Sequence, residues 1–310
     1  MPENTADMAI KNNEILLNRS TRKPRSEPFV LRLFQKLFEI GGRISPKLAS
    51  RIAYRLWLTP TRFKTPASEQ KALRSAAIAF HRINEKDIAT FTWEHTDQTT
   101  EPAAKPTVLL VHGWSGRGTQ MGSFVEPLID AGYRVISFDA PAHGKSSGKQ
   151  TTLYEISDAI LAMQDIYGEF DSVISHSFGG PCTALAITHG LKIKRLVSIS
   201  PPATTIGLVD KFSDALHLTK KTRQNLIDRM TKNFGSHIWE ELSMKNTVKE
   251  IDIPGLVIHD EHDIDVAWEE GQAVAHAWNH APFIITSGLG HRRILRDNFV
   301  LESTLKFLNV

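Results

Sequence analysis

The feature that most constrains this chain is a short turn around Ser177. A β-branched run at residues 172–175 leads into the segment SHSFGG at residues 175–180, and a helical pattern begins at Pro181. Proline suits the first turn of a helix, where its missing N–H costs little. The pattern predicts a strand, a sharp turn and a helix, with the Ser177 hydroxyl at the tip of the turn.

The chain around this turn alternates between strand-like and helix-like patterns. Most segments between the predicted strands have helical periodicity, and the strands are predicted at residues 89–95, 105–111, 133–138, 172–175, 194–200, 254–258 and 282–286. A continuous apolar run such as residues 107–111 is typical of a central parallel strand. The alternation predicts the α/β class, with a mostly parallel, twisted sheet covered by helices on both faces.

One connection between predicted strands is too long for a plain crossover. Residues 203–250 contain several helical patterns between the strands at 194–200 and 254–258. We interpret this insertion as a helical cap over the substrate pocket. The core of the domain then consists of residues 88–202 and 251–310.

Residues 1–87 form an extension before this core. We expect a flexible arm at residues 1–27, followed by helices at about 29–40, 45–58 and 68–80, the first of them ended by Gly41-Gly42. The first helix has apolar residues on one face and charged residues on the other. Such helices either pack on the core or contact a membrane surface through basic flanks and exposed apolar side chains.

The composition narrows the class of protein and its compartment. With 310 residues, 41% of them hydrophobic, the chain can bury a full α/β core, and its net charge of +3 does not indicate a nucleic-acid partner. Cys182 is the only cysteine, so no intrachain disulfide can form and a cytoplasmic location is expected. We expect neither a membrane span nor a signal peptide, and both a monomer and a dimer remain open.

A serine hydroxyl becomes a good nucleophile only when a neighbouring histidine removes its proton. That histidine in turn needs a carboxylate to orient it. His291 lies on a glycine-flanked loop, GLGHRR, after the last predicted strand. The segment HDEHDIDV at residues 259–266 follows the strand at 254–258 and offers several carboxylates. A metal site involving His259 and His262 is the weaker reading, because the segment matches no spaced zinc motif.

The segment SHSFG resembles the G-x-S-x-G nucleophile elbow of the α/β-hydrolase family, with Ser175 in place of the first glycine. In that family the order along the chain is Ser, acid, His, which implies Ser177 as nucleophile and His291 as base. The family's acid loop reads roughly His-Gly-x-x-Asp-x-x-Val. Aligned with residues 259–266, it implies Asp263 as the acid, with Asp260 as the main rival.

Two further segments resemble family motifs. HGWSGR at residues 112–117 is similar to the family's His-Gly-x loop, which implies that the backbone N–H groups of Trp114 and Phe178 form the oxyanion hole. His112 is then a structural residue that braces this loop. The segment FDAPAHGKS at residues 138–146 resembles the turn that shapes the carboxyl edge of the sheet, so Asp139 and His143 are expected to do no chemistry.

Together these motifs resemble the α/β-hydrolase superfamily over residues 88–310, and within it the bacterial intracellular serine carboxylesterases. The resemblance implies hydrolysis of small-molecule esters of short to medium acyl chains, with no cofactor and no metal. Serine at the elbow argues against dehalogenases and epoxide hydrolases, which use aspartate. We expect three residues to contact the acyl group: Trp114, Pro201 and Trp239.

The same triad leaves other functions open. These are thioester or amide hydrolysis, carbon–carbon bond hydrolysis, acyl transfer and cofactor-free perhydrolysis, since the fold alone does not choose among them. A non-catalytic protein that binds a small molecule in the same pocket is a further alternative.

Overall fold

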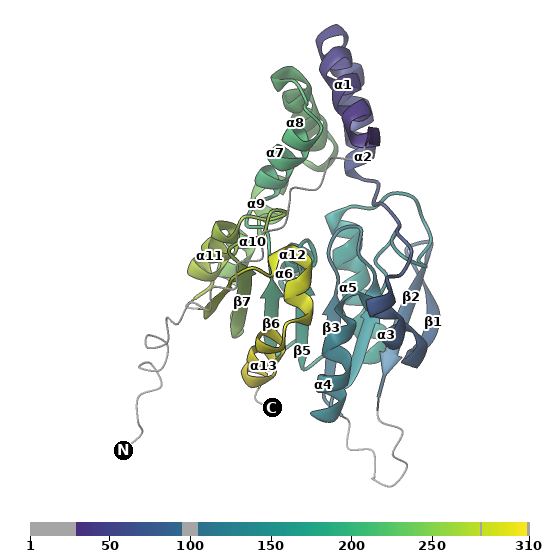
Figure 1. The fold of residues 1–310 in the computed structure, drawn as a ribbon, viewed down its shortest axis with the longest axis vertical. Coiled ribbons are helices and arrows are strands. Elements are labelled where there is room, and N and C mark those ends of the chain that lie inside the picture. The colour runs from purple at the N-terminus through teal and green to yellow at the C-terminus, as the bar shows by residue number, and fades with distance from the viewer. Residues whose placement is uncertain (1–28, 95–104, 280, 309–310) are drawn as a thin grey trace.

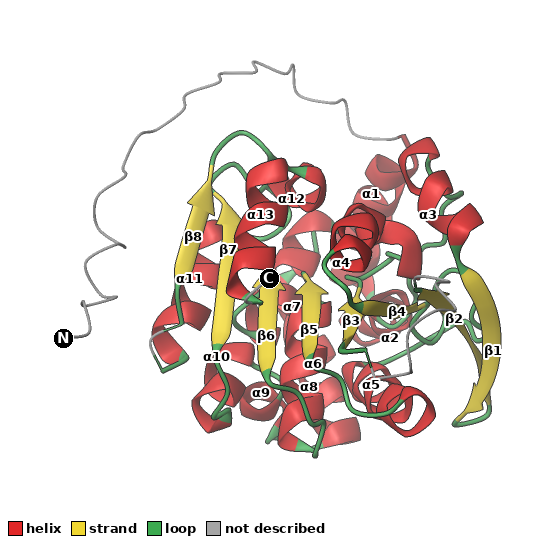
Figure 2. Ribbon diagram, turned by 90° about the horizontal axis from the view of Figure 1, so that it is seen from below, coloured by secondary structure: helices red, strands yellow, loops and turns green. Residues whose placement is uncertain are grey.

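The computed structural model describes residues 29–94, 105–279 and 281–308, and in this part of the chain an eight-stranded sheet forms the centre (Figure 2). Its spatial order is β1-β2-β4-β3-β5-β6-β7-β8. The strands are β1 (Ala77–Ile83), β2 (Lys86–Trp93), β3 (Thr107–Val111), β4 (Arg134–Phe138), β5 (Ser172–His176), β6 (Arg195–Ile199), β7 (Gly255–Asp260) and β8 (Phe283–Thr286). The flexible arm expected at residues 1–27 lies outside the described residues.

Most neighbouring strands are parallel. β2 pairs antiparallel with both β1 and β4, and from β4 to β8 every neighbouring pair is parallel. Parallel neighbours need crossover connections, which here contain helices. The prediction of a mostly parallel sheet in an α/β fold is confirmed.

Helices cover both faces of the sheet (Figure 2). The longer ones are α1 (Phe29–Ile44), α2 (Pro46–Trp57), α5 (Leu153–Tyr167), α6 (Gly179–Thr188), α7 (Thr205–Ala215), α8 (Lys220–Phe234), α11 (Trp268–Ala277) and α13 (Asn298–Phe307). Shorter ones are η1 (Ala67–Glu69), α3 (Gln70–Ser75), η2 (Gly118–Phe124), α4 (Val125–Asp130), α9 (Ile238–Glu241), α10 (Met244–Thr247), η3 (Val248–Glu250), α12 (Gly290–Arg293) and η4 (Ile294–Arg296). None of the described helices is both long enough and apolar enough to cross a bilayer.

The apolar run of β3 shows why the sheet is covered twice. All five of its residues are buried. Because side chains alternate along a strand, Leu109 and Val111 belong to one hydrophobic core, and Val108 and Leu110 belong to the other. A strand with two buried faces must be continuously apolar, as the sequence indicated.

Two predictions in the extension are wrong. The helix expected at 68–80 ends at Ser75, because residues 77–83 instead form the edge strand β1, with Ile78 opposite Phe91. Gly41-Gly42 does not end the first helix, since α1 continues to Ile44. A Cβ on Gly42 would lie 2.9 Å from Thr222 Oγ1, so this glycine allows α1 to approach α8 closely.

The predicted cap segment consists of α7, α8, α9, α10 and η3, between β6 and β7. The N-terminal helices lie beside it, and Figure 1 shows α1, α2, α7 and α8 together above the sheet. Gln35 Nε2 donates to Ala215 O at 3.2 Å, and the rings of Trp57 and Phe212 meet edge-on at 5.3 Å. α1 and α2 therefore pack on the cap helices, while β1 joins the sheet of the core.

Candidate active site

The predicted turn around Ser177 is present, with β5 before it and α6 after it. Ser177 has φ +52°, a left-handed conformation that non-glycine residues adopt only when their surroundings hold them there. Its N–H donates to Ile199 O at 2.8 Å. A Cβ on Gly179 would lie 2.7 Å from Val111 O, and a Cβ on Gly113 would lie 2.8 Å from Ser177 Cβ. Close backbone approach on both sides of the hydroxyl thus requires these two glycines.

His291 and Asp263 form a hydrogen-bonded pair. Nδ1 of His291, in α12, lies 2.7 Å from Oδ2 of Asp263, whose side chain is fully buried. Oδ1 of Asp263 accepts the backbone N–H groups of Asp265 and Val266 at 2.8 and 2.9 Å. Burial alone would raise the pKa of Asp263, but hydrogen bonds from His259 and His291 outweigh it and hold that pKa well below its usual range. The carboxylate is therefore ionised beside the imidazole.

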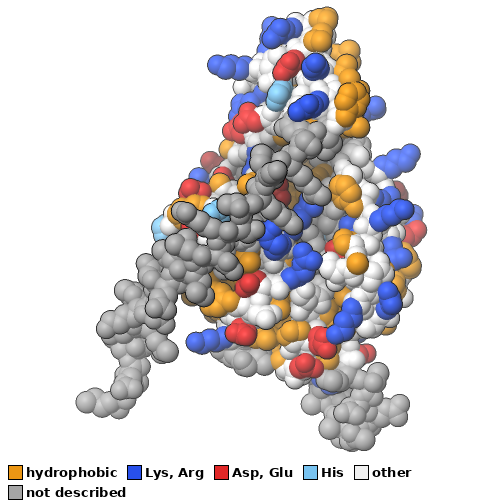
Figure 3. All heavy atoms as spheres, in the orientation of Figure 1, with side chains coloured by type: hydrophobic (Ala, Val, Ile, Leu, Met, Phe, Trp, Pro, Cys, Tyr) orange, Lys and Arg blue, Asp and Glu red, His pale blue; other side chains and the backbone are white. Residues whose placement is uncertain are grey.

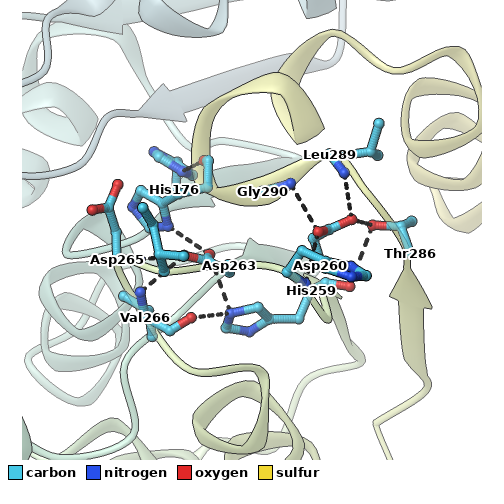
Figure 4. Close-up of polar contacts among 12 residues, drawn as sticks. His176, His259, Asp260, Asp263, Asp265, Val266, Thr286, Leu289 and Gly290 are labelled. Carbon is cyan, nitrogen blue, oxygen red and sulfur yellow. Dashed lines mark hydrogen bonds and ion pairs between the residues drawn. The ribbon is translucent and has the colours of Figure 1, made fainter. Parts of the chain in front are cut away.

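Asp260, the rival acid, is turned toward Thr286, Leu289 and Gly290 rather than toward Asp263 (Figure 4). Its Oδ2 accepts from Thr286 Oγ1 and Leu289 N at 2.9 and 3.0 Å, and its Oδ1 accepts from Gly290 N at 2.8 Å. Asp260 also accepts the backbone N–H of His262. It anchors the loop that carries His291 and makes no contact with the imidazole itself.

Two histidines that the sequence did not assign to catalysis brace the pair. His259 Nε2 lies 3.4 Å from Asp263 Oδ2 and 3.1 Å from Val266 O. His176 donates from Nε2 to the His291 carbonyl at 2.9 Å, and their rings are 4.6 Å apart. Burial lowers the pKa of His176 well below its ordinary value, so its ring is neutral. The only sequence signals were the positions of His176 beside Ser177 and of His259 at the start of the acid loop.

The weaker metal interpretation involved His259 and His262. Among the described residues, no group of three or more His, Cys, Asp or Glu side chains is placed to hold a metal ion. His259 is buried against Asp263 and the Val266 carbonyl, as described above, while the His262 side chain is 64% exposed. The two rings therefore lie in different environments.

Ser177 and His291 line the same cavity, together with Trp114. Among the described residues no hydrogen bond links the Ser177 hydroxyl to the His291 ring. Such catalytic contacts often shorten only when substrate is bound. The cavity thus exposes the Ser177 hydroxyl and His291, whose Nδ1 is bonded to the buried Asp263 carboxylate.

The two predicted oxyanion donors lie beside this hydroxyl. Neither the Trp114 N–H nor the Phe178 N–H donates to another described residue, and the Trp114 and Phe178 rings meet edge-on at 5.4 Å. His112 braces the Trp114 loop, because its Nδ1–H donates to Gly113 O at 2.7 Å and its Nε2 accepts from Ala140 N at 3.0 Å. Burial lowers the pKa of His112 to about 4, which keeps this ring neutral.

The turn that begins at Asp139 supports the same edge of the sheet. Asp139 Oδ1 accepts from Gly118 N and Oδ2 from Lys145 N, both at 2.6 Å. His143 Nδ1 donates to Pro141 O at 3.0 Å. Both side chains are buried in backbone contacts, as expected of a turn that only shapes the site.

The cavity beside Ser177 has a volume of about 370 Å³ and mostly apolar walls. The cap and the extension supply much of this wall, through Leu56, Trp57, Leu208, Phe212, Met230 and Phe234. Of the three residues expected to contact the acyl group, only Trp114 lines it. The Trp239 indole N–H is turned toward Thr231 Oγ1 at 2.9 Å, and Pro201 is buried against the start of α6.

The chain has the α/β-hydrolase fold. The model for the alpha/beta hydrolase fold matches residues 106–245. The bromoperoxidase of Bacillus anthracis, a solved structure, is 19% identical with a TM-score of 0.56, over 76% of this chain and 100% of that one. At that identity the likeness shows the fold alone.

Two curated proteins match parts of the chain. The dihydrolipoyllysine-residue acetyltransferase component of the acetoin cleaving system of Cupriavidus necator is 34% identical over 117 residues, which cover 35% of this chain and 31% of that protein. The pimeloyl-(acyl-carrier protein) methyl ester esterase of Aromatoleum aromaticum is 38% identical over 98 residues, which cover 31% of this chain and 37% of that protein. The chain thus spans about a third of the length of these relatives.

Proposed function

We propose that this chain is a serine hydrolase that cleaves carboxylic esters. The observation that carries the proposal is the hydrogen bond between His291 and the ionised Asp263, beside a cavity that also exposes Ser177 on a strained turn. A carboxylate in this position favours the imidazolium that forms when His291 accepts a proton. The esterase among the curated relatives supports the choice of esters.

In the proposed mechanism, Ser177 Oγ bonds to the acyl carbon while His291 Nε2 takes the hydroxyl proton. The N–H groups of Trp114 and Phe178 stabilise the oxyanion, and such donors are typically worth a few kcal/mol each. The bond to the alcohol then breaks, and His291 returns its proton to the departing oxygen. Water, deprotonated by His291, releases the acid and restores Ser177.

The apolar cavity of about 370 Å³ is proposed to hold the acyl group. The cap and α2 supply much of its apolar wall. A cavity of this size favours short to medium acyl chains. We further propose a cytoplasmic location, since the single cysteine, Cys182, is a buried free thiol.

The test is intact-mass analysis after reaction with a fluorophosphonate, which labels activated serines whatever the natural acyl group. Wild type should gain one adduct and Ser177→Ala none, while the control Ser75→Ala, exposed on α3 and outside both cavities at the site, should label like wild type. An unlabelled wild type, or equal labelling of Ser177→Ala, would contradict the proposal. Added alcohols or thiols then separate the alternative of acyl transfer, which makes a product that depends on the acceptor.

A further inference from the structure

A second cavity, of about 400 Å³, also reaches the reacting centre. Four residues line both cavities: Trp114, Ser177, His291 and Arg292. The scissile bond of a substrate bound at Ser177 would therefore lie where the two cavities meet. The acyl group enters only one of them, which leaves the second for the other half of the substrate.

The lining of the second cavity is rich in cations. It includes Lys64, Arg117, Arg292 and Arg296, against a single carboxylate, Glu69. Glu69 already accepts from Thr119 Oγ1 at 2.8 Å and lies 3.6 Å from Arg117 Nε. Lys64, Arg292 and Arg296 are exposed and make no ion pair with any other described residue. The cavity thus carries net positive charge.

The guanidinium of Arg117 is only 12% exposed, and its Nη1 has no hydrogen-bond partner among the described residues. Buried donors without partners are uncommon, and each one calls for a physical reason. A guanidinium presents several N–H groups in a plane that matches the oxygens of a carboxylate or phosphate. A bound anion would supply the missing acceptor.

We propose that this cavity, here called the cationic cavity, binds an anionic group on the alcohol or thiol half of the substrate. The inference rests on the proposed function, because it assumes that Ser177 is acylated. Ser177 Oγ bonds to the acyl carbon, the bond to the anionic alcohol or thiol breaks, and the proton held by His291 leaves with that group. The shared chemistry is a phosphate or carboxylate, and substrates that carry each distinguish the two.

The test compares butyrate esters whose alcohols carry different charges. 1-Butyrylglycerol is neutral, 1-butyrylglycerol 3-phosphate and 3-butyryloxypropionate carry the two anions, and butyrylcholine carries a cation. At low salt, kcat/KM for at least one anionic ester should exceed that of the neutral ester by about tenfold or more, and the ratio should fall as salt rises. Butyrylcholine should be the poorest substrate.

Substitutions then test whether the cationic cavity causes the preference for anionic esters. The double variant Lys64→Gln/Arg296→Gln should lower the ratio of anionic to neutral kcat/KM by about tenfold, whereas Lys149→Gln, an exposed charge outside the cavity, should leave the ratio unchanged. Equal kcat/KM for neutral and anionic esters in wild type overturns the inference, as does a ratio that the double variant keeps.

Failure of this inference is distinguishable from failure of the proposed function. Hydrolysis of 1-butyrylglycerol without an anion preference refutes only the cationic cavity, while absence of fluorophosphonate labelling refutes the hydrolase itself. Titration calorimetry of Ser177→Ala with glycerol 3-phosphate and with glycerol tests the site without turnover. Tighter binding of the phosphate is expected, and equal affinities contradict the inference.

An independent feature lies on α1. The residues of α1 that face the rest of the protein are Gln35, Phe38 and Gly42. The opposite side is apolar and exposed, from Phe29 at 81% to Ile44 at 80%, and it includes Val30, Leu33, Leu37 and Ile40. Figure 3 shows hydrophobic side chains along one edge of the projection at the top of the molecule. We call this the α1 apolar face.

Exposed basic residues lie on α1 and on the next helix, α2. None pairs with a described acid: Arg32, Lys36 and Arg43 on α1, and Lys47, Arg51 and Arg55 on α2. The only acid on α1 and α2 is Glu39, which bonds His217 Nδ1 at 2.8 Å. An apolar helix face bordered by cations is complementary to an anionic lipid surface.

From this charge pattern we infer that α1 and α2 dock on an anionic lipid surface. The test is sedimentation with vesicles of phosphatidylcholine alone or with about one quarter phosphatidylserine. Partitioning should favour the anionic vesicles and drop about fivefold for each cation removed in Arg43→Gln and Lys47→Gln. Leu33→Gln/Leu37→Gln should also weaken it, whereas Phe299→Gln, exposed on α13, should not.

Two outcomes contradict the lipid surface. One is equal or absent binding to both kinds of vesicle. The other is a dimer in analytical ultracentrifugation that Leu33→Gln/Leu37→Gln dissociates, without vesicle binding, because it would make a second copy the occupant of the α1 apolar face.

Discussion

Replacing Asp263 and Asp260 in turn by asparagine separates the roles of these two acids. In Asp263→Asn the side-chain oxygen can still accept from Asp265 and Val266, but the amide NH₂ then faces the Nδ1–H of His291, so two donors oppose each other. The negative charge that favours the imidazolium is lost as well. We expect kcat/KM to fall about 10³- to 10⁴-fold, which is about 4 to 5.5 kcal/mol in activation free energy.

Asp260→Asn should mainly affect stability. An amide at this position leaves Leu289 N–H and Thr286 Oγ1 without the carboxylate oxygen that accepts from them. With about 1 to 1.5 kcal/mol for each lost hydrogen bond, unfolding should become easier by about 2 to 3 kcal/mol. Because the His291 ring keeps its own partner, kcat/KM should fall by less than about tenfold.

The assay combines initial rates on 4-nitrophenyl butyrate with urea unfolding of the two variants and wild type. The expected pattern is a far larger rate loss for Asp263→Asn than for Asp260→Asn, while both variants unfold more easily than wild type because each loses hydrogen bonds to a buried carboxylate. The reasoning is refuted if Asp263→Asn keeps more than a tenth of the wild-type kcat/KM, or if Asp260→Asn loses more activity than Asp263→Asn.

Three further predictions concern stability and acyl selectivity. Burial is the main cause that lowers the folded-state pKa of His112 to about 4 and that of His143 to about 3. Both rings stay neutral in the folded protein, so their full contribution to the free energy of unfolding is present above the unfolded-state pKa near 6.5. That contribution is lost as the pH falls below this value. Urea unfolding between pH 7 and 4 should show a slope of about 1.4 kcal/mol per pH unit for each ring, and a pH-independent stability would contradict it. Gly179→Ala places a Cβ 2.7 Å from Val111 O and should cost about 1 to 3 kcal/mol of unfolding free energy. The control Gly41→Ala, in helix α1 and with no atom near its Cβ, should cost nothing. Each added acyl CH₂ should raise kcat/KM up to about fourfold until the cavity is full, which sets an optimal acyl chain length. Leu56→Trp, at the cavity wall, should move that optimum to shorter chains. An optimum that the substitution leaves unchanged would argue against acyl binding in this cavity.

Local patterns were enough to predict most of the sheet. The run at residues 107–111 is apolar because both faces of β3 are buried. Such a run can be recognised in the sequence without knowing which strands and helices pack against it. β1 was missed because its pairing with β2, such as Ile78 opposite Phe91, overrides the weak helical pattern of its residues. Gly42 was misread for a similar reason, since its partner Thr222 lies far along the chain.

The site was predictable where its geometry is local. The turn around Ser177 follows from small residues within a few positions of it. Motif alignment selected Asp263 over Asp260, but the local pattern alone does not separate these two neighbouring acids. The distinction depends on contacts with residues such as Leu289 and His291, far along the chain. The roles of His176 and of the α2 side chains in the cavity wall likewise depend on tertiary packing.

The wall that α2 contributes to the acyl cavity has a consequence for how such a protein can diverge. Leu56 and Trp57 lie outside residues 106–245, the part that carries the superfamily's shared pattern. Substitutions in α2 can reshape the space for the acyl chain while leaving the elbow and the His291 loop unchanged. The preference for acyl chains can therefore change while the catalytic residues stay the same. Exchanging α2 between homologous chains is a direct way to change this preference.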